Sequence, residues 1–308
     1  MTLLFSIREH EALAAELREL TGYDEGQLEC RIFPDGERYL RILSPVRAQD
    51  VVIVGGTTTD TATLDIFDLA CGLVTAGCQS LTLLIPFFGY STMERAVKSG
   101  EVVTAKTRAH LLSIIPTAPG GNRVALLDLH SEGIPHYFEP GVVSTHLYAK
   151  SVILDAIRGL GLGDFSLGSV DAGRAKWVES LANDLGVVPS FVLKRRSSDR
   201  KTEVIAVSAS VSGRPVVIYD DMIRTGGSLL GAARAFRDAG ATDVYAVASH
   251  GVFPGDALER IRGSGFIRRV VVTNSHPWAM RRPADDGFLT VRSCAPVFQA
   301  FLATLGHA

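Results

Sequence analysis

Short apolar runs alternate along the chain with longer stretches in which apolar residues recur every three or four positions. Runs of four to six apolar residues are typical of strands buried on both faces, and the periodic stretches are typical of helices with one buried face. The predicted strands span residues 51–54, 81–85, 123–127, 166–170, 216–219, 243–248 and 270–273. The predicted helices span residues 63–77, 104–115, 174–186 and 227–240. This alternation predicts an α/β fold with mainly parallel sheets covered by helices on both faces.

An internal repeat predicts two similar domains. Residues 51–88 align with residues 216–253 after a two-residue slip, and both segments read as strand, turn, helix and strand. A length of 308 residues also favours two domains. We expect doubly wound domains at 1–145 and 146–285, with residues 286–308 packing back on the first domain.

Composition narrows the class of protein. Hydrophobic residues make up 46% of the chain and charged residues 21%, which is typical of a soluble globular protein. The net charge of −2 argues against a nucleic-acid-binding protein. Residues 69–93 carry no charge, but Gly72, Gly77, Pro86 and Gly89 interrupt them, so we expect no membrane span. The four cysteines lack zinc-site spacing and are too few for a disulfide scaffold in a chain this long, which favours reduced thiols and a cytoplasmic location.

The two copies of the repeat differ in one chemically important place. Asp220 and Asp221 stand in the second copy where the first has two glycines, Gly55 and Gly56. The two acids follow the apolar run 216–219, at the carboxyl end of a predicted strand, where open parallel sheets bind their ligands. Adjacent carboxylates repel each other, so they need a partner: a cation, or hydroxyl groups that donate to them.

A glycine-rich turn follows the acidic pair. Thr225, Gly226, Gly227 and Ser228 lead into a helix, and backbone N–H groups at a helix N-terminus favour a phosphate. Carboxylates for hydroxyls and a turn for phosphate together describe a sugar-phosphate site. The plainer alternative is a helix N-cap by Thr225 or Ser228 beside two solvated aspartates, which does not account for two acids at the end of a strand.

This stretch resembles the phosphoribosyl diphosphate loop of phosphoribosyltransferases and of ribose-phosphate diphosphokinases. Four further segments resemble the diphosphokinases: FPDGERYLRI (33–42), LLDLHSEGIPHYF (126–138), SVDAGRAKW (169–177) and LKRRSSDRKTEV (193–204). ASHGVFP (248–254) and VVTNSHP (271–277) follow in the family's order and spacing. The resemblance therefore covers nearly the whole chain.

The resemblance implies a type I phosphoribosyltransferase-like fold, a reaction and a set of site residues. The reaction is transfer of the diphosphoryl group of ATP to the 1-hydroxyl of ribose 5-phosphate, with Mg²⁺ and with AMP as the second product. The implied residues are Phe33, Asp35, Glu37, Arg95 and His130 for ATP; His130 and Asp171 for the metal; Lys194 and Arg196 for catalysis; and Asp220, Asp221, Arg224, Thr225, Gly226, Gly227 and Ser228 for ribose 5-phosphate. A homo-oligomer with shared active sites is also implied.

One segment departs from the commoner members of the family. FFGYSTMERAVKSGEVVTAKT (87–107) lacks their Arg-Gln-Asp run and is closer to the plant-type class II members. Two alternatives stay open, and the departure at 91–93 supports the first of them. A non-catalytic homologue would bind nucleotide and regulate a partner synthetase, although Lys194 and Arg196 would then serve no purpose. A phosphoribosyltransferase would share only the 216–228 stretch.

Overall fold

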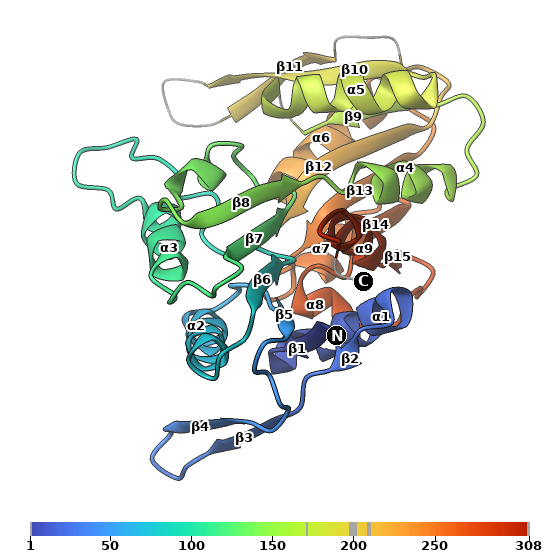
Figure 1. Ribbon diagram of the computed structural model, residues 1–308. Helices are drawn as coiled ribbons and strands as arrows, with labels where there is room; N and C mark the ends of the chain where they lie inside the picture. Colours follow the sequence, from blue (N-terminus) through green and yellow to red (C-terminus); the bar gives the residue numbers. More distant parts are fainter. Residues whose placement is uncertain (1, 171, 197–201, 208–210, 307–308) are drawn as a thin grey trace. The chain divides into compact units, whose positions relative to one another are not determined.

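The computed structural model describes residues 2–170, 172–196, 202–207 and 211–306 (Figure 1). The chain divides into two compact units. Unit 1 comprises Met1–Tyr148, Ser275–Pro277 and Cys294–Ala308, and unit 2 comprises Ala149–Asn274 and Trp278–Ser293.

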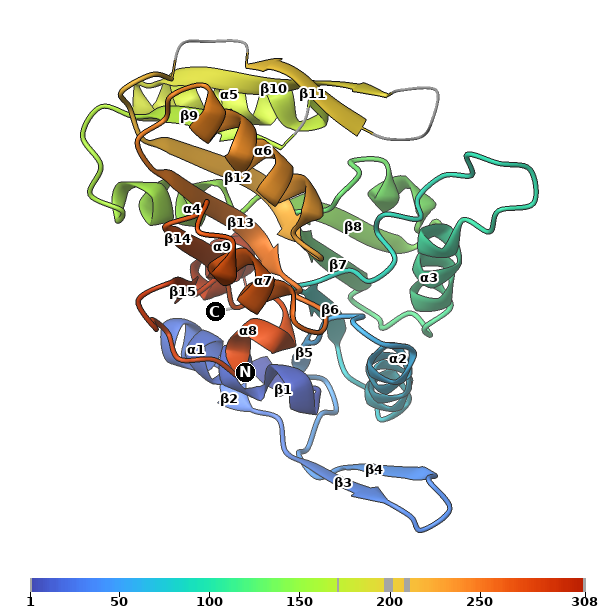
Figure 2. The same ribbon diagram turned by 180° about the vertical axis from the view of Figure 1, so that it is seen from behind.

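Unit 1 is built on a six-stranded parallel sheet with the strand order β2-β1-β5-β6-β7-β8. The strands are β1 (Thr2–Ser6), β2 (Asp24–Glu25), β5 (Asp50–Val54), β6 (Ser80–Ile85), β7 (Asn122–Leu127) and β8 (Val142–Leu147). Two further strands, β3 (Leu28–Ile32) and β4 (Arg38–Ile42), form an antiparallel hairpin. Figures 1 and 2 both show this hairpin as an arm that extends away from the sheet.

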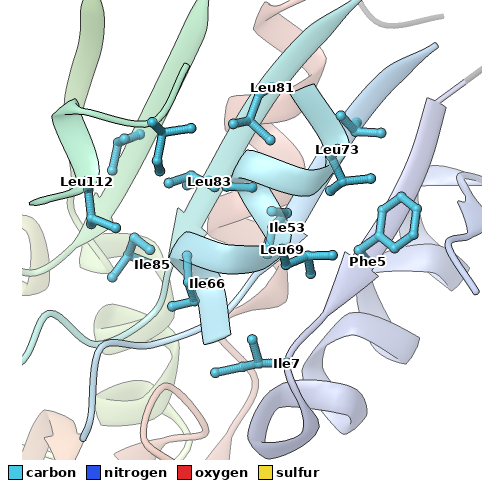
Figure 3. Close-up of a cluster of buried hydrophobic side chains, with 14 of the residues drawn as sticks. Phe5, Ile7, Ile53, Ile66, Leu69, Leu73, Leu81, Leu83, Ile85 and Leu112 are labelled. Atoms are coloured by element: carbon cyan, nitrogen blue, oxygen red, sulfur yellow. The ribbon is translucent and has the colours of Figure 1, made fainter. Parts of the chain in front are cut away.

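Helices cover both faces of the unit 1 sheet because its strands are apolar on both sides. They are α1 (Glu11–Thr21), α2 (Asp60–Thr75), α3 (Thr104–Ser113) and α9 (Ala295–Thr304), with the short 3-10 turns η1 (Arg8–His10) and η2 (Ile134–Tyr137). Alternate residues of β5 point to opposite faces. Val51 and Ile53 join the cluster formed with α2 and α3, as Figure 3 shows for Ile53, and Val52 is buried on the other face. On that other face α1 contacts β1, β5 and α9.

Unit 2 is built on a seven-stranded sheet with the order β11-β10-β9-β12-β13-β14-β15, and only the β10–β11 pair is antiparallel. The strands are β9 (Ser166–Ser169), β10 (Val188–Arg196), β11 (Thr202–Val207), β12 (Val216–Ile223), β13 (Val244–Gly251), β14 (Arg269–Thr273) and β15 (Leu289–Arg292). The helical segments are α4 (Lys150–Arg158), η3 (Ala172–Arg174), α5 (Ala175–Leu185), α6 (Gly227–Asp238), α7 (Ala257–Gly263) and the short α8 (Pro277–Met280). Helix α5 lies in front of the sheet in Figure 1 and α6 in front of it in the reverse view of Figure 2, so they cover opposite faces.

The α/β fold class with mainly parallel sheets is confirmed, and a strand lies at each predicted position. One boundary is wrong in an informative way, because the strand predicted to end at residue 219 continues to Ile223. Asp220, Met222 and Ile223 pair with β13, and Met222 and Ile223 are buried. Backbone pairing therefore carries the acidic pair into the sheet. Among the residues that the structure describes, none of the helices combines the length and apolar character needed to cross a lipid bilayer.

Candidate functional site

Asp220 and Asp221 lie in the second half of β12, within the strand and not beyond its end. Asp221 is buried, whereas Asp220 is half-buried. The Asp221 backbone N–H donates to Oδ1 of Asp220 at 3.0 Å, which holds the Asp220 carboxyl group close to the chain. A buried carboxylate is stable only when a hydrogen-bond donor or a cation compensates for its lost hydration.

Arg174 supplies a cation to Asp221. Its Nη2 lies 2.6 Å from Oδ2 of Asp221, and the two side chains are only 21% and 5% exposed. Burial raises the pKa of Asp220 well above its usual range, and the negative charge of Asp221 and a hydrogen bond with it raise the pKa further. Arg174 opposes this effect.

Sequence reasoning missed Arg174, although a signal was present. The residue is the N-cap of α5. The N-terminus of a helix carries partial positive charge, so a cation is unfavourable there unless a nearby anion compensates. An arginine at the start of a predicted helix therefore indicates an acidic partner, but the sequence does not say which acid it is.

The 225–228 loop connects β12 directly to α6. Gly226 is the N-cap of α6 and has a left-handed backbone conformation with φ of 78°, which L side chains rarely adopt. No side chain caps this helix, and its first turn contains no acidic residue. The alternative in which Thr225 or Ser228 caps the helix is therefore wrong. The first N–H groups of an α-helix have no acceptor within the helix, so this end of α6 presents donors and a favourable dipole to an anion.

The equivalent position in unit 1 is closed. Thr59 is the N-cap of α2, and its hydroxyl accepts the Ala62 N–H at 3.0 Å. Asp60 in the first turn adds negative charge there. Where unit 2 carries the acidic pair, Gly56 lies against His10, and a Cβ on Gly56 would be 3.0 Å from the imidazole Cε1. The two halves of the repeat thus share a strand–turn–helix unit, and unit 2 leaves its helix N-terminus uncapped by a side chain.

Helix α7 supports the 225–228 loop from one side. Nη2 of Arg260 donates to the Thr225 carbonyl oxygen at 3.2 Å, and Ile261 packs against Gly226. In a trans peptide the carbonyl and the following N–H point in opposite directions. By holding the Thr225 carbonyl on the α7 side, Arg260 turns the Gly226 N–H away from α7. Arg224 at the start of the loop is exposed.

Phe33, Asp35 and Glu37 lie in the turn between β3 and β4. The Phe33 ring is 44% exposed and meets Tyr39 edge-on, with ring centroids 6.1 Å apart. The Glu37 backbone N–H donates to Oδ1 of Asp35 at 3.1 Å. Phe33 is therefore not part of the core, and this turn presents an aromatic face beside two carboxylates.

Arg95 and His130 are both exposed side chains of unit 1. Arg95 lies in the loop between β6 and α3, is 78% exposed, and has its Nε 3.5 Å from Oε1 of Glu94. His130 follows β7. The Leu129 backbone N–H donates to Nε2 of His146 at 2.9 Å, so His146 on β8 anchors the segment that carries His130.

Part of the predicted site falls outside the described residues. This applies to Asp171 and to the side chains of Lys194 and Arg196. The backbones of the two basic residues belong to β10, where Lys194 pairs with Val204 and Arg196 with Thr202 of β11. The described residues contain no group of three or more His, Cys, Asp or Glu side chains that could hold a metal ion. Magnesium keeps several waters and needs few protein ligands, so the small number of residues predicted for it, His130 and Asp171, is compatible with this metal.

The family models and the curated relatives agree on one family. Residues 2–115 match the N-terminal domain of ribose phosphate pyrophosphokinase, and residues 177–291 match the phosphoribosyl synthetase-associated domain. The chain is 34% identical over 297 residues to the ribose-phosphate pyrophosphokinase of Synechococcus elongatus, which covers 95% of this chain and 87% of that protein. It is also 34% identical over 281 residues to ribose-phosphate pyrophosphokinase 1, chloroplastic, of Arabidopsis thaliana, covering 90% and 68%.

A solved structure agrees with these relatives. The crystal structure of phosphoribosylpyrophosphate synthetase from Mycobacterium smegmatis superimposes with a TM-score of 0.85 at 28% identity, covering 99% of this chain and 98% of that one. The order of the segments, the fold and the relatives all lead to the same assignment: this chain belongs to the ribose-phosphate pyrophosphokinase family.

Proposed function

We propose that this chain transfers the diphosphoryl group of ATP to the 1-hydroxyl of ribose 5-phosphate and releases AMP. The observation that carries the proposal is the pairing, on one strand–turn–helix unit, of the acidic pair on β12 with the uncapped N-terminus of α6. These groups suit the hydroxyls and the phosphate of one phosphorylated pentose. Membership of the ribose-phosphate pyrophosphokinase family supports the same chemistry.

In this proposal unit 2 binds the sugar phosphate. Asp220 and Asp221 accept hydrogen bonds from the 2- and 3-hydroxyls of the ribose. Residues 225–228 bind the 5-phosphate through backbone N–H groups and the hydroxyls of Thr225 and Ser228, both of which are exposed. Arg224 adds a positive charge at the edge of the loop. The 146–285 region is then the ribose-phosphate domain.

The 1–145 region binds ATP in this proposal. Phe33 stacks on the adenine ring, which requires the exposed position that its side chain has. Asp35 and Glu37 accept hydrogen bonds from the adenine edge. Arg95 and His130 contact the ATP phosphates. Both are exposed and so can reach a ligand.

Lys194 and Arg196 are the proposed catalytic residues, because phosphoryl transfer depends on positioning and on positive charge around the transferred group. His130 and Asp171 would hold Mg²⁺, which neutralises charge on the ATP phosphates when it is bound. Mg²⁺ keeps several waters in its coordination shell, which agrees with so small a number of protein donors.

We also propose that the chain forms a homo-oligomer in the cytoplasm. The β3–β4 arm carries Ile32, which is 71% exposed, next to Phe33, and apolar side chains of this kind are stable when a partner covers them. Light scattering on a sizing column tests this proposal, since a monomer at micromolar concentration contradicts it.

The test of the proposed function is direct. The purified chain is incubated with Mg²⁺, ATP and ribose 5-phosphate, and both products are measured. We expect AMP and 5-phosphoribosyl 1-diphosphate to form in equal amounts. A Lys194→Ala variant controls for contaminating activity. Nucleotide binding without AMP would favour the regulatory homologue, for which the atypical 91–93 segment is the best support. Consumption of 5-phosphoribosyl 1-diphosphate with a nucleobase would favour a phosphoribosyltransferase.

A further inference from the structure

The contact between Arg174 and Asp221 joins two elements of unit 2 that are distant in sequence. Arg174 is the N-cap residue of α5, and Asp221 lies in β12. Their 2.6 Å contact is short even for a charge-assisted hydrogen bond, and both side chains are largely withdrawn from water. A contact of this kind restricts both side chains to one arrangement.

The ion pair has costs that packing alone would avoid. Arg174 holds a cation at the partially positive end of α5, and Asp221 loses the hydration of its carboxylate. Apolar residues of similar volume often replace a buried ion pair with no loss of stability. The position of the pair, directly beside Asp220, suggests that its role concerns the acidic pair.

We propose that Arg174 is a positioning residue for the sugar site: it holds the Asp221 carboxylate in one orientation beside Asp220, so that the pair meets the ribose hydroxyls already arranged. This inference rests on the proposed function, in which the acidic pair binds those hydroxyls. Arg174 acts through Asp221, so it is not itself a catalytic residue.

The physical basis is repulsion between neighbouring carboxylates. The backbone N–H of Asp221 donates to Asp220, and Arg174 donates to Asp221, so each acid has a donor besides the hydrogen bond between the two side chains. Without Arg174 the Asp221 carboxylate would lose this buried cation and would turn toward water or toward another donor. Either change alters the acceptor geometry that the sugar meets and adds a reorganisation cost to sugar binding.

The prediction separates sugar binding from ATP binding. Arg174→Met should raise the KM for ribose 5-phosphate roughly tenfold, the loss expected for one charge-assisted hydrogen bond, and leave the KM for ATP within about threefold. Arg174→Lys keeps the charge and should recover part of the loss. Lys176→Met removes an exposed cation from the same helix and should change neither constant.

A double-mutant cycle tests whether Arg174 acts through Asp221. Arg174→Met combined with Asp221→Asn should be no worse in ribose 5-phosphate affinity than Asp221→Asn alone, because the partner is already lost. Additive effects, or an equal rise in the KM for ATP, would overturn the inference. If Arg174→Met fails to fold, Arg174→Lys with Asp221→Asn completes the same cycle.

Calorimetry measures ribose 5-phosphate binding directly, so it tests the role of Arg174 separately from the proposed reaction. If the wild-type chain makes no AMP, the proposed function fails. The cycle measured on sugar-phosphate affinity then still decides the role of Arg174. Absence of any ribose 5-phosphate binding by the wild-type chain would refute both.

Discussion

Gly226→Ala is the substitution that most directly tests the shape of the 225–228 loop. Gly226 has φ of 78°, and the left-handed conformation costs an L residue about 1–2 kcal/mol. A Cβ at this position would lie 2.6 Å from Cδ1 and 2.7 Å from Cγ1 of Ile261, which is fully buried. Overpacking of this kind costs about 1–3 kcal/mol. Together the two effects predict a loss of about 2–5 kcal/mol, a large fraction of the stability of a typical domain.

Urea unfolding of the variant and of two reference variants measures this loss. Gly231→Ala is the matched control, because Gly231 lies within the same helix and a Cβ there meets nothing within 4 Å. It should stabilise the chain by about 0.5–1 kcal/mol. Ile261→Ala removes both atoms that the new methyl group would meet. Combined with Gly226→Ala it should therefore leave only the backbone cost, and the cycle should show a coupling of about 1–3 kcal/mol.

The same variant links the loop to function. A distorted loop turns its N–H groups away from the bound phosphate, so the KM for ribose 5-phosphate should rise more than the KM for ATP. A stability within 0.5 kcal/mol of wild type would refute the reasoning from backbone conformation and packing. A destabilised variant that binds ribose 5-phosphate normally would refute the assignment of this loop to the phosphate.

Three further predictions follow from other contacts. Burial lowers the pKa of His10 from 6.5 to about 4, and its Nδ1 accepts the Gly56 N–H at 3.3 Å. The unfolded chain takes up this proton first, so about 3 kcal/mol of stability is present above pH 6.5 and is lost as the pH falls toward 4. Urea unfolding of His10→Gln between pH 7 and pH 4.5 should show a flatter decline than wild type, and equal slopes would contradict this. Arg260→Met releases the Thr225 carbonyl and should raise the KM for ribose 5-phosphate about threefold to tenfold, whereas Arg234→Met on α6 should not; no difference between the two would refute the supporting role of Arg260. Lys194→Ala should lower kcat at least about a hundredfold while calorimetry finds ribose 5-phosphate affinity within about threefold of wild type, and parallel losses would place Lys194 in sugar binding instead.

The α/β fold could be predicted from the sequence because its information is local. The buried strands are short and apolar on both faces, so their own residues predict a parallel sheet without information from other segments. The acidic pair and the 225–228 loop could also be predicted from the sequence. The groups that would bind the two ends of one pentose lie within nine residues, from Asp220 to Ser228. No contact between distant segments is needed to place these groups near one ligand.

Other features required contacts between distant segments. The extension of β12 to Ile223 depends on pairing with β13, and the burial of Asp221 coincides with its contact with Arg174. In unit 1, the place equivalent to the acidic pair is filled by His10, which lies against Gly56. Each of these joins residues far apart in the chain, and the sequence pattern around each partner is compatible with many others.

What the amino-acid order specifies here is therefore the set of elements and the chemistry carried by short contiguous segments, since backbone propensity and neighbouring side chains suffice to define both. Which charge neutralises Asp221, how far β12 extends and which aromatic side chain reaches solvent were settled by packing. Long-range contacts select one partner among many, and burial then sets the cost of leaving a charge or a hydrogen-bonding group without one.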